Sequence, residues 1–291
     1  MTVHTDTAGP EMPRVAALTV YPLKSAAGIA VEQLSLDDRG AMGDRRWLLV
    51  DGEGMAITAR TCHGLLHVVP RFATGDRNGA LLLDAPWHPT FTAVVPGADS
   101  PQRTVQVWDD AVAALDAGDE AADWCSDVIG RACRLVYLDD DSQRPLRPKY
   151  AGPLPHEARR VAFTDGAPLL LLGYPSVDAL NARLVEQGHG ETMDRRRFRA
   201  NVWLDRLPPH AEDQWSAVTI GDVPVGVGSL CTRCVLTTVD PDSLEQGTEP
   251  LRTFSAYRRT ADGVVFGVNA THARTGVIRV GDVVQVHATK A

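Results

Sequence analysis

The stretch SLCTRCVLTTVDPD, residues 229–242, contains two thiols, a cation between them and an apolar run. The guanidinium of Arg233 favours the charged form of a neighbouring cysteine, because a nearby positive charge lowers the pKa of a thiol. Residues 235–239 are rich in β-branched side chains and lead into the turn residues 240–242, so a strand is predicted there. The stretch therefore predicts a reactive thiol beside a β-strand.

Three kinds of chemistry are compatible with the pair Cys231 and Cys234. Structural zinc needs four ligands, usually from a second pair at similar spacing, and the remaining cysteines are scattered at positions 62, 125 and 133. A redox pair of the thioredoxin type would lie between a strand and a helix, whereas this pair precedes a predicted strand. The third alternative is one thiolate that binds a soft or intermediate metal held mainly by a cofactor. The two cysteines could also be ordinary core residues, because free cysteine is often buried.

The composition is that of an ordinary soluble globular protein. A chain of 291 residues with 44% hydrophobic and 23% charged residues can bury the core of one large or two medium domains. The net charge of −8 argues against general binding to nucleic acid or anionic membranes. Five irregularly spaced cysteines argue against a disulfide framework, and no apolar run or signal-like start is present. A cytoplasmic protein is expected.

Two short motifs near the start of the chain bring cations to the ends of predicted strands. Residues 14–21 form a strand-like run that Pro22 stops, so Lys24 and Ser25 are expected on a loop. An ammonium, a hydroxyl and backbone N–H groups can together bind a phosphate, although Lys-Ser pairs are also common on surfaces. Arg45 begins a second strand-like run, where an arginine is usually a solvated edge cation.

Strand-like runs recur about every ten residues up to Trp108, which is typical of a small barrel or sandwich. A helix that buries Cys125 is predicted from residue 119 to Gly130. Residues 139–157 lack a pattern and predict a linker, although Arg144, Arg147 and Lys149 could instead shape a substrate entrance. The predicted organisation is a disordered tail (1–13), an N-terminal β-barrel-like domain (14–140), a linker (141–157) and a second domain (158–291).

The second domain opens with an apolar run followed by a helix, which Ser176 is expected to cap and which extends to about Glu186. Residues 195–205, RRRFRANVWLD, place four arginines around one phenylalanine. Charge runs are usually solvated faces, but in an acidic protein this one could form a site for a dianion. Strands flanking Gly221-Asp222, a short helix at 249–257 and a closing hairpin at 277–286 complete the prediction.

Four ordered motifs carry a resemblance to a known family: YPLKSAAG (21–28), GDRRW (43–47), RFRAN (197–201) and CTRCVLTTVDP (231–241). Together they resemble the MOSC N-terminal β-barrel and the MOSC domain, most closely in proteins of the amidoxime-reducing component type. The resemblance covers nearly the whole chain after about residue 13, and the four motifs together make it specific. It implies a mainly β fold with a few helices (α+β), in which a MOSC β-barrel domain follows the N-terminal β-barrel domain.

The resemblance also implies a molybdenum–molybdopterin cofactor without an attached nucleotide, and no pyridoxal phosphate. Cys234, the second cysteine of its motif, would be the metal ligand and the catalytic residue. In the family, hydroxylated residues are common at the positions of Gly166 and Ala167, so only backbone N–H donors could serve there. The match at Asn269 is loose. The residues implied to contact the cofactor are Lys24, Ser25, Arg45, Gly166, Ala167, Arg199, Asn201, Thr232, Arg233 and Asn269.

The implied function is a molybdenum oxidoreductase that reduces N-hydroxylated compounds such as amidoximes, hydroxylamines and N-hydroxylated bases. The alternative is a carrier or delivery protein for the cofactor, which needs the same contacts without turnover. The sequence has neither a set of cysteines for an iron–sulfur cluster nor a dinucleotide-binding glycine motif. Electrons are therefore expected from a ferredoxin, or from a cytochrome b5-like protein with a reductase, and an acidic donor would suit a rim of Arg144, Arg147 and residues 195–197.

Overall fold

The structure is a computed structural model that describes residues 12–75, 77, 79–155, 160–190 and 192–290. Most of the predicted tail, residues 1–13, lies outside the described residues. The described chain is mainly β, with three α-helices: α1 (Asp119–Ile129), α2 (Tyr174–Glu186) and α3 (Leu251–Tyr257). None of these helices is long and apolar enough to cross a membrane. The predicted fold class, mainly β with a few helices, is confirmed.

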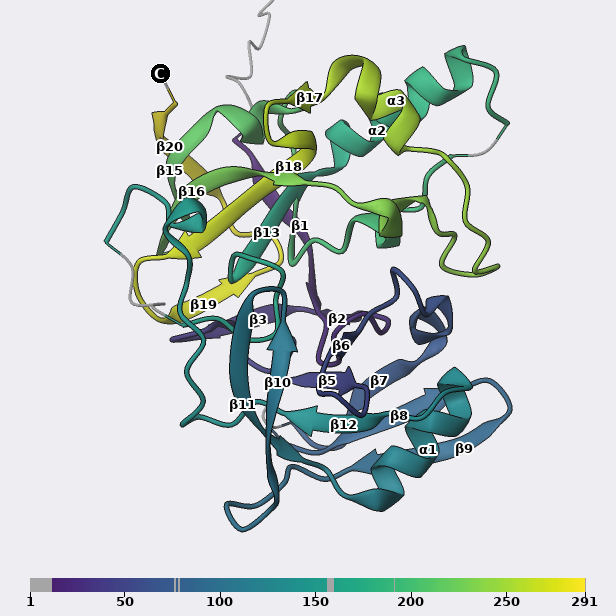
Figure 1. The fold of residues 1–291 in the computed structure, drawn as a ribbon. Coiled ribbons are helices and arrows are strands. Elements are labelled where there is room, and N and C mark those ends of the chain that lie inside the picture. The colour runs from purple at the N-terminus through teal and green to yellow at the C-terminus, as the bar shows by residue number, and fades with distance from the viewer. Residues whose placement is uncertain (1–11, 76, 78, 156–159, 191, 291) are drawn as a thin grey trace, which may run out of the picture.

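One large sheet forms the upper half of the molecule in Figure 1, with α2 and α3 packed at its top. Leu18, Val202, Leu171 and Val268 lie opposite one another across four neighbouring strands, and all four are almost fully buried. Their apolar contacts form the centre of the main core. In sheet order the strands are β2 (Ile29–Val31), β1 (Arg14–Val20), β14 (Val202–Asp205), β13 (Leu169–Gly173), β18 (Gly263–His272), β16 (Val223–Thr232), β15 (Trp215–Ile220) and β20 (Val284–Thr289), with β17 (Arg259–Thr260) paired to β18.

Two smaller sheets form the lower half of the molecule, and a third lies at the junction with the large sheet (Figure 1). Helix α1 packs against the two sheets of the lower half, with Cys125 2% exposed in their core, and it ends at Gly130, as predicted, where the backbone is left-handed. The five-stranded sheet has the order β10 (Gln102–Val107), β11 (Asp110–Asp116), β12 (Arg134–Tyr137), β5 (Trp47–Val50), β6 (Ala56–Ile57). The three-stranded sheets are β7 (Val69–Phe72), β8 (Leu81–Ala85), β9 (His88–Ala93) and β19 (Gly276–Arg279), β3 (Gln33–Asp37), β4 (Gly40–Ala41).

Strand pairing joins the beginning of the chain to its end. Strand β1 pairs with β14, and β3 pairs with β19 through the opposed and fully buried residues Leu34 and Ile278. The first strands of the N-terminal part therefore complete sheets of the C-terminal part. The loop that follows β1, which carries Lys24, is brought in this way to the junction of the two halves. The division at residues 141–157 stays a prediction.

The segment before residue 156 is held by Arg144, whose side chain is almost fully buried. Its guanidinium donates to Asp110 Oδ2 at 2.9 Å and to the carbonyl oxygens of Ala162 and Thr164 at 2.7 and 2.6 Å. A desolvated guanidinium needs several such acceptors. The expectation that Arg144 contributes to an exposed rim or entrance is therefore wrong, because it fastens the segment to the fold.

The predicted strand at residues 235–239 is instead a 3₁₀-helix, η5 (Val235–Thr238). Two threonine hydroxyls explain the difference: Thr237 donates to the carbonyl of Cys234 at 3.0 Å, and Thr238 donates to that of Val235 at 2.7 Å. Such local bonds give a β-branched run an alternative to strand pairing. The turn bends the chain directly after Cys234, and the strand of this motif is β16, which contains Cys231 and ends at Thr232, before Cys234.

Ser176 does not cap helix α2, because the helix begins two residues earlier at Tyr174, with Pro175 in its first turn. Proline suits this position, since its missing N–H would be unpaired there in any case. The Ser176 hydroxyl is buried and donates to the Glu212 carboxylate at 2.8 Å. This serine therefore fastens α2 to η4 (Ala211–Gln214).

The closing hairpin predicted at residues 277–286 is also wrong. Strand β19 pairs with β3 and β20 pairs with β15, so the chain passes from one sheet to another at Gly281-Asp282. The turn is held by strand β1, because Val15 donates to the carbonyl of Asp282 at 2.9 Å and Gly281 donates to that of Val15 at 2.8 Å. The glycine-aspartate signal predicted a turn correctly but not the partners of its strands.

Candidate functional site

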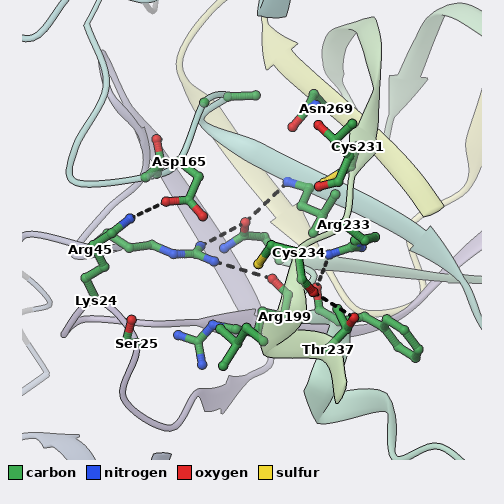
Figure 2. A pocket seen from close by; sticks show the side chains of 18 of the residues that line it. Lys24, Ser25, Arg45, Asp165, Arg199, Cys231, Arg233, Cys234, Thr237 and Asn269 are labelled. Atoms are coloured by element: carbon green, nitrogen blue, oxygen red, sulfur yellow. Dashed lines mark hydrogen bonds and ion pairs between the residues drawn. The ribbon is translucent and has the colours of Figure 1, made fainter. Parts of the chain in front are cut away.

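The residues that the sequence motifs single out gather around one cavity of about 140 Å³ at the junction of the two halves. All eleven line it: Lys24, Ser25, Arg45, Gly166, Ala167, Arg199, Asn201, Thr232, Arg233, Cys234 and Asn269. Figure 2 shows Lys24, Ser25 and Arg45 approaching from one side, and Cys231, Cys234 and Asn269 from the other. Other lining residues were not expected from the sequence, including Arg60, Asp165 and Thr237. We call this space the inner cavity.

Three of these side chains are carried by backbone in the left-handed region. Ser25, Arg45 and Arg199 have φ angles of 72°, 49° and 55°. This conformation is uncommon for residues other than glycine and is found most often where a site requires a particular orientation. All three lie on loops next to strands or short helices, at points where the rigid sheet gives way to turns.

A chain of ionic contacts connects the lysine of the first motif to the cysteine of the last. Lys24 donates to Asp165 Oδ1 at 2.6 Å, and Arg60 donates to the other oxygen of that carboxylate. The Nε of Arg60 also donates to the sulfur of Cys234 at 3.3 Å. This contact places a guanidinium directly against the sulfur that the resemblance implies as the metal ligand.

The cation expected to act on the thiols was Arg233, but its side chain is directed elsewhere. Its Nε donates to the carbonyl of Phe266 and its Nη1 to that of Phe198, both at 2.8 Å. Burial raises the pKa of Cys231, and the charge of Arg233 offsets only part of this rise. The charge of Arg233 therefore acts on Cys231 in the expected direction but is outweighed by burial, and the guanidinium in contact with the Cys234 sulfur belongs to Arg60.

Arg45 and Arg199 both contact one tyrosine ring. Their guanidinium carbons are 4.4 and 4.2 Å from the centre of the Tyr21 ring, which is buried. Cation–π contact with this shared ring keeps two like charges close together at the cavity wall. Arg45 is further held by Asp44 at 2.5 Å, whereas no acidic partner of Arg199 is found among the described residues.

Asn201 organises this pair of arginines. Its amide nitrogen donates to Thr19 O and Asp44 Oδ1, both at 3.1 Å, and its oxygen accepts from Arg45 at 3.1 Å and from the Leu170 N–H at 3.3 Å. The protein thus uses the whole hydrogen-bonding capacity of this buried amide. In this arrangement Asn201 orients Arg45, and its direct contact with a ligand stays a prediction.

The inner cavity is suited to an anion. Six cationic side chains and a single carboxylate, Asp165, line it, although the chain as a whole has a net charge of −8. Within the described residues, Nη2 of Arg199 and Nη2 of Arg233 are buried without a hydrogen-bond acceptor. Unpaired buried donors are costly, so an anionic ligand would satisfy them. The cations are Lys24, Arg45, Arg60, Arg197, Arg199 and Arg233.

Burial also changes the titration of these groups. It lowers the pKa of Lys24 to about 8, against the opposing charge of Asp165. It lowers the pKa of Arg199 to about 10. Burial alone would raise the pKa of Asp165, but the charges of Lys24 and Arg60 hold it well below its usual range. Lys24 is therefore the cation of this cavity that can lose its charge at mildly alkaline pH.

We expect the affinity of the cofactor-free protein for sulfate to fall as the pH rises through about 8. Lys24 is protonated below its pKa, so the ammonium is lost above about 8, and the affinity is expected to fall up to about tenfold by pH 9. Sulfate is a suitable probe because it stays a dianion over this range. Titration calorimetry between pH 6.5 and 9 would measure the effect.

The matched variant for this experiment is Lys24→Arg. A guanidinium stays charged throughout the pH range, so the alkaline loss of affinity is expected to disappear. An equal loss in Lys24→Arg and in the unmodified protein would show that another group causes it.

Gly166 departs from the family pattern for a steric reason. A Cβ at this position would lie 2.4 Å from the ring of Tyr150, so no serine or threonine fits while the ring is in place. The nearby hydroxyl of Thr164 is buried and has no hydrogen-bond partner in the described chain. The aromatic ring thus occupies the space that a hydroxylated side chain would require at residue 166.

The fold and the cavity together define the class of protein. The model of the MOSC N-terminal beta barrel domain matches residues 12–132, and that of the MOSC domain matches residues 158–285. The chain belongs to the family of proteins in which a MOSC domain follows a MOSC N-terminal β-barrel domain. The family resemblance expected from the four motifs is confirmed.

Individual relatives resemble the chain over most of its length. It is 31% identical to mitochondrial amidoxime-reducing component 1 of Mus musculus, over 92% of this chain and 80% of that protein. Its identity to the corresponding protein of Homo sapiens is 30%, over 92% of this chain and 81% of that protein. It is also 28% identical to the molybdenum cofactor sulfurase of Danio rerio, over 88% of this chain but only 31% of that larger protein.

Proposed function

We propose that this protein is a molybdenum-cofactor-dependent oxidoreductase that reduces N-hydroxylated compounds. The observation that carries the proposal is the inner cavity, in which the sulfur of Cys234 faces a space lined by six cations and one carboxylate. Molybdopterin carries a phosphate and provides two sulfur ligands for its metal, so it needs a cationic pocket and few protein ligands. The names of the amidoxime-reducing relatives support the same activity.

The described residues contain no cluster of three or more His, Cys, Asp or Glu placed to bind a metal by themselves. A metal held mainly by a cofactor, with Cys234 as its protein ligand, is compatible with this arrangement. Lys24, Ser25, Arg45 and Arg199 would hold the phosphate and the pterin through charge-assisted hydrogen bonds. When bound, the cofactor supplies a metal that exchanges an oxo group and two electrons with the substrate.

The reaction requires two electrons and two protons for each N–O bond that is cleaved, and it releases one water. We infer that the electrons come from an external protein, a ferredoxin or a cytochrome b5-like protein with its reductase. The rim of arginines at residues 195–197, which is expected to attract an acidic donor, carries less free positive charge than the sequence suggests, because each arginine has an acidic partner. Arg195 pairs with Asp178, Arg196 with Asp194 and Asp242, and Arg197 is buried against Asp240.

Cofactor analysis and an activity assay test the proposal together. We expect purified protein to contain about one molybdenum and one molybdopterin per chain, and to reduce benzamidoxime with a chemical electron donor. NADH or NADPH alone should give no turnover, because the chain has no motif for a dinucleotide. Tight cofactor binding with no turnover of any N-hydroxylated compound would favour the carrier role, which the sulfurase relative makes the second candidate.

A further inference from the structure

An outer chamber of about 390 Å³ adjoins the inner cavity and shares part of its wall. The shared residues include Arg60, Asp165 and Cys234. Two short segments complete the chamber, and none of their residues belongs to a motif of the cofactor site: they are Trp108, Asp109, Arg147, Lys149 and Tyr150. The volume lies within the range of small-molecule sites, so a substrate could approach the Cys234 sulfur through this space.

Trp108 forms one wall under backbone strain. It is the first residue of the two-residue turn between β10 and β11, where its φ angle is 57°. Such turns favour glycine, asparagine or aspartate, and a bulky side chain there is a true outlier. The indole Nε1 donates to Asp165 at 3.2 Å, and the guanidinium of Arg60 lies 4.8 Å from the ring centre. The ionic network of the site therefore holds the ring at its mouth, where 54% of the residue stays exposed.

Tyr150 forms a second wall, and close packing against glycines holds its ring and its backbone in place. It ends η2 (Pro148–Tyr150), and its ring lies over the bare backbone of Gly166. Two further glycines let this segment lie directly on strand β16: a Cβ at Gly228 would come within 2.6 Å of the Tyr150 carbonyl, and Gly152 lies against Gly226. The Tyr150 ring and its segment are thus packed against glycine backbone, where an added side chain would collide with them.

Among the described residues, the charges at the rim leave one cation without an acidic partner. Arg147 is neutralised by Asp109 and Asp110, at 3.2 and 2.7 Å. Lys149 is exposed and, within the described chain, pairs with no carboxylate; its ammonium lies 4.8 Å from the centre of the Tyr150 ring. A rim of this kind favours a ligand with an anionic group, bound at Lys149.

We propose that Trp108 and Tyr150 are specificity-determining residues, and that they select flat, π-conjugated N-hydroxylated substrates that carry an anionic group bound by Lys149. The inference rests on the proposed function. Flat rings stack favourably on aromatic walls, whereas compact aliphatic compounds gain little from them. An N-hydroxylated pyrimidine nucleotide has the required chemistry, since it combines a planar base, an N–O bond and a phosphate.

The first experiment measures binding without turnover. Cytidine 5′-monophosphate, which is flat and anionic and has no N–O bond to cleave, is titrated calorimetrically into the protein that holds its cofactor. We expect Trp108→Gly and Lys149→Gln each to weaken binding by about tenfold. Glycine relieves the strain at residue 108, so this variant is expected to fold. Unchanged affinity in both variants would overturn the proposal.

The second experiment compares kcat/KM for benzamidoxime with that for acetamidoxime. The unmodified protein should prefer the aromatic compound, and Trp108→Gly should lower this ratio by about tenfold. Trp87→Gly is the matched control, because Trp87 has a φ angle of 67° in another hairpin, is fully exposed and lies outside the chamber. An equal change in both variants would overturn the proposal. If neither amidoxime is reduced, the proposed function fails, and the binding titration still decides whether the chamber takes such ligands.

Discussion

Replacing Cys234 with alanine is expected to reduce kcat for amidoxime reduction by at least about a thousandfold, because under the proposed function the variant would lose the protein ligand of the metal. The molybdenum content should fall, while part of the molybdopterin stays bound through Lys24, Arg45 and Arg199. Metal analysis, pterin analysis and steady-state kinetics on the same preparation would measure the three quantities. The loss of a half-buried thiol should have little effect on the fold.

Cys231→Ala provides the matched control, three residues earlier, at the end of strand β16. Among the described residues, the Cys231 thiol donates only to the carbonyl of Thr232, at 3.7 Å, and Arg60 contacts the sulfur of Cys234 instead. We therefore expect a loss of less than about tenfold in kcat and an unchanged molybdenum content. Full activity and full metal content in Cys234→Ala would refute the assignment of the ligand.

Sequence motifs predicted which residues line the inner cavity because each motif keeps its side chains on one loop. They could not predict which of these side chains contact one another. Arg60 and Asp165 lie 174 and 69 residues before Cys234 and belong to none of the four sequence motifs. Only the folded chain brings them to the sulfur and to Lys24. The sequence pointed to Arg233, which is adjacent to Cys234, as the cation beside the sulfur. In the folded chain, the guanidinium that donates to this sulfur belongs to Arg60.

Local errors of prediction had local physical causes. The β-branched run after Cys234 suggested a strand, but two threonine hydroxyls bond back to the preceding carbonyls and close a 3₁₀ turn. The sequence suggested that Arg144 is a solvated cation in a linker. In the structure its side chain is buried, and its guanidinium donates to three acceptor oxygens. In each case the side chain could make either kind of contact, and the surrounding fold decided between them.

The aromatic walls of the outer chamber illustrate a different limit. Trp108 occupies a turn position where propensity disfavours it, and Tyr150 lies in a segment without periodicity. Neither residue has a sequence signal. The position of Tyr150 depends on Gly166, which receives its ring, and on Gly228, which receives its backbone, and both glycines are distant in sequence. Departure from a propensity rule is expected where function opposes it.

Replacing Arg199 with methionine is expected to weaken molybdopterin binding by about 10- to 150-fold. This range corresponds to the loss of charge-assisted hydrogen bonds worth about 1.5–3 kcal/mol. The same change should alter the free energy of unfolding of the cofactor-free protein by less than about 1 kcal/mol. Burial of the charged guanidinium, with Nη2 unpaired within the described chain, opposes the favourable contacts to Tyr21 and the Ala26 carbonyl.

The two roles predict opposite results. A ligand-binding Arg199 predicts loss of pterin with little change in stability, whereas a structural Arg199 predicts loss of stability with pterin retained. Pterin content after purification and thermal unfolding of the cofactor-free protein are the two measurements. Arg195→Met is the matched control, four residues earlier, where the arginine is exposed, pairs with Asp178 and does not line the inner cavity. It should retain the full pterin content. If Arg199→Met instead destabilised the cofactor-free protein by several kcal/mol and kept its pterin, Arg199 would be a structural residue that supports the Tyr21 ring.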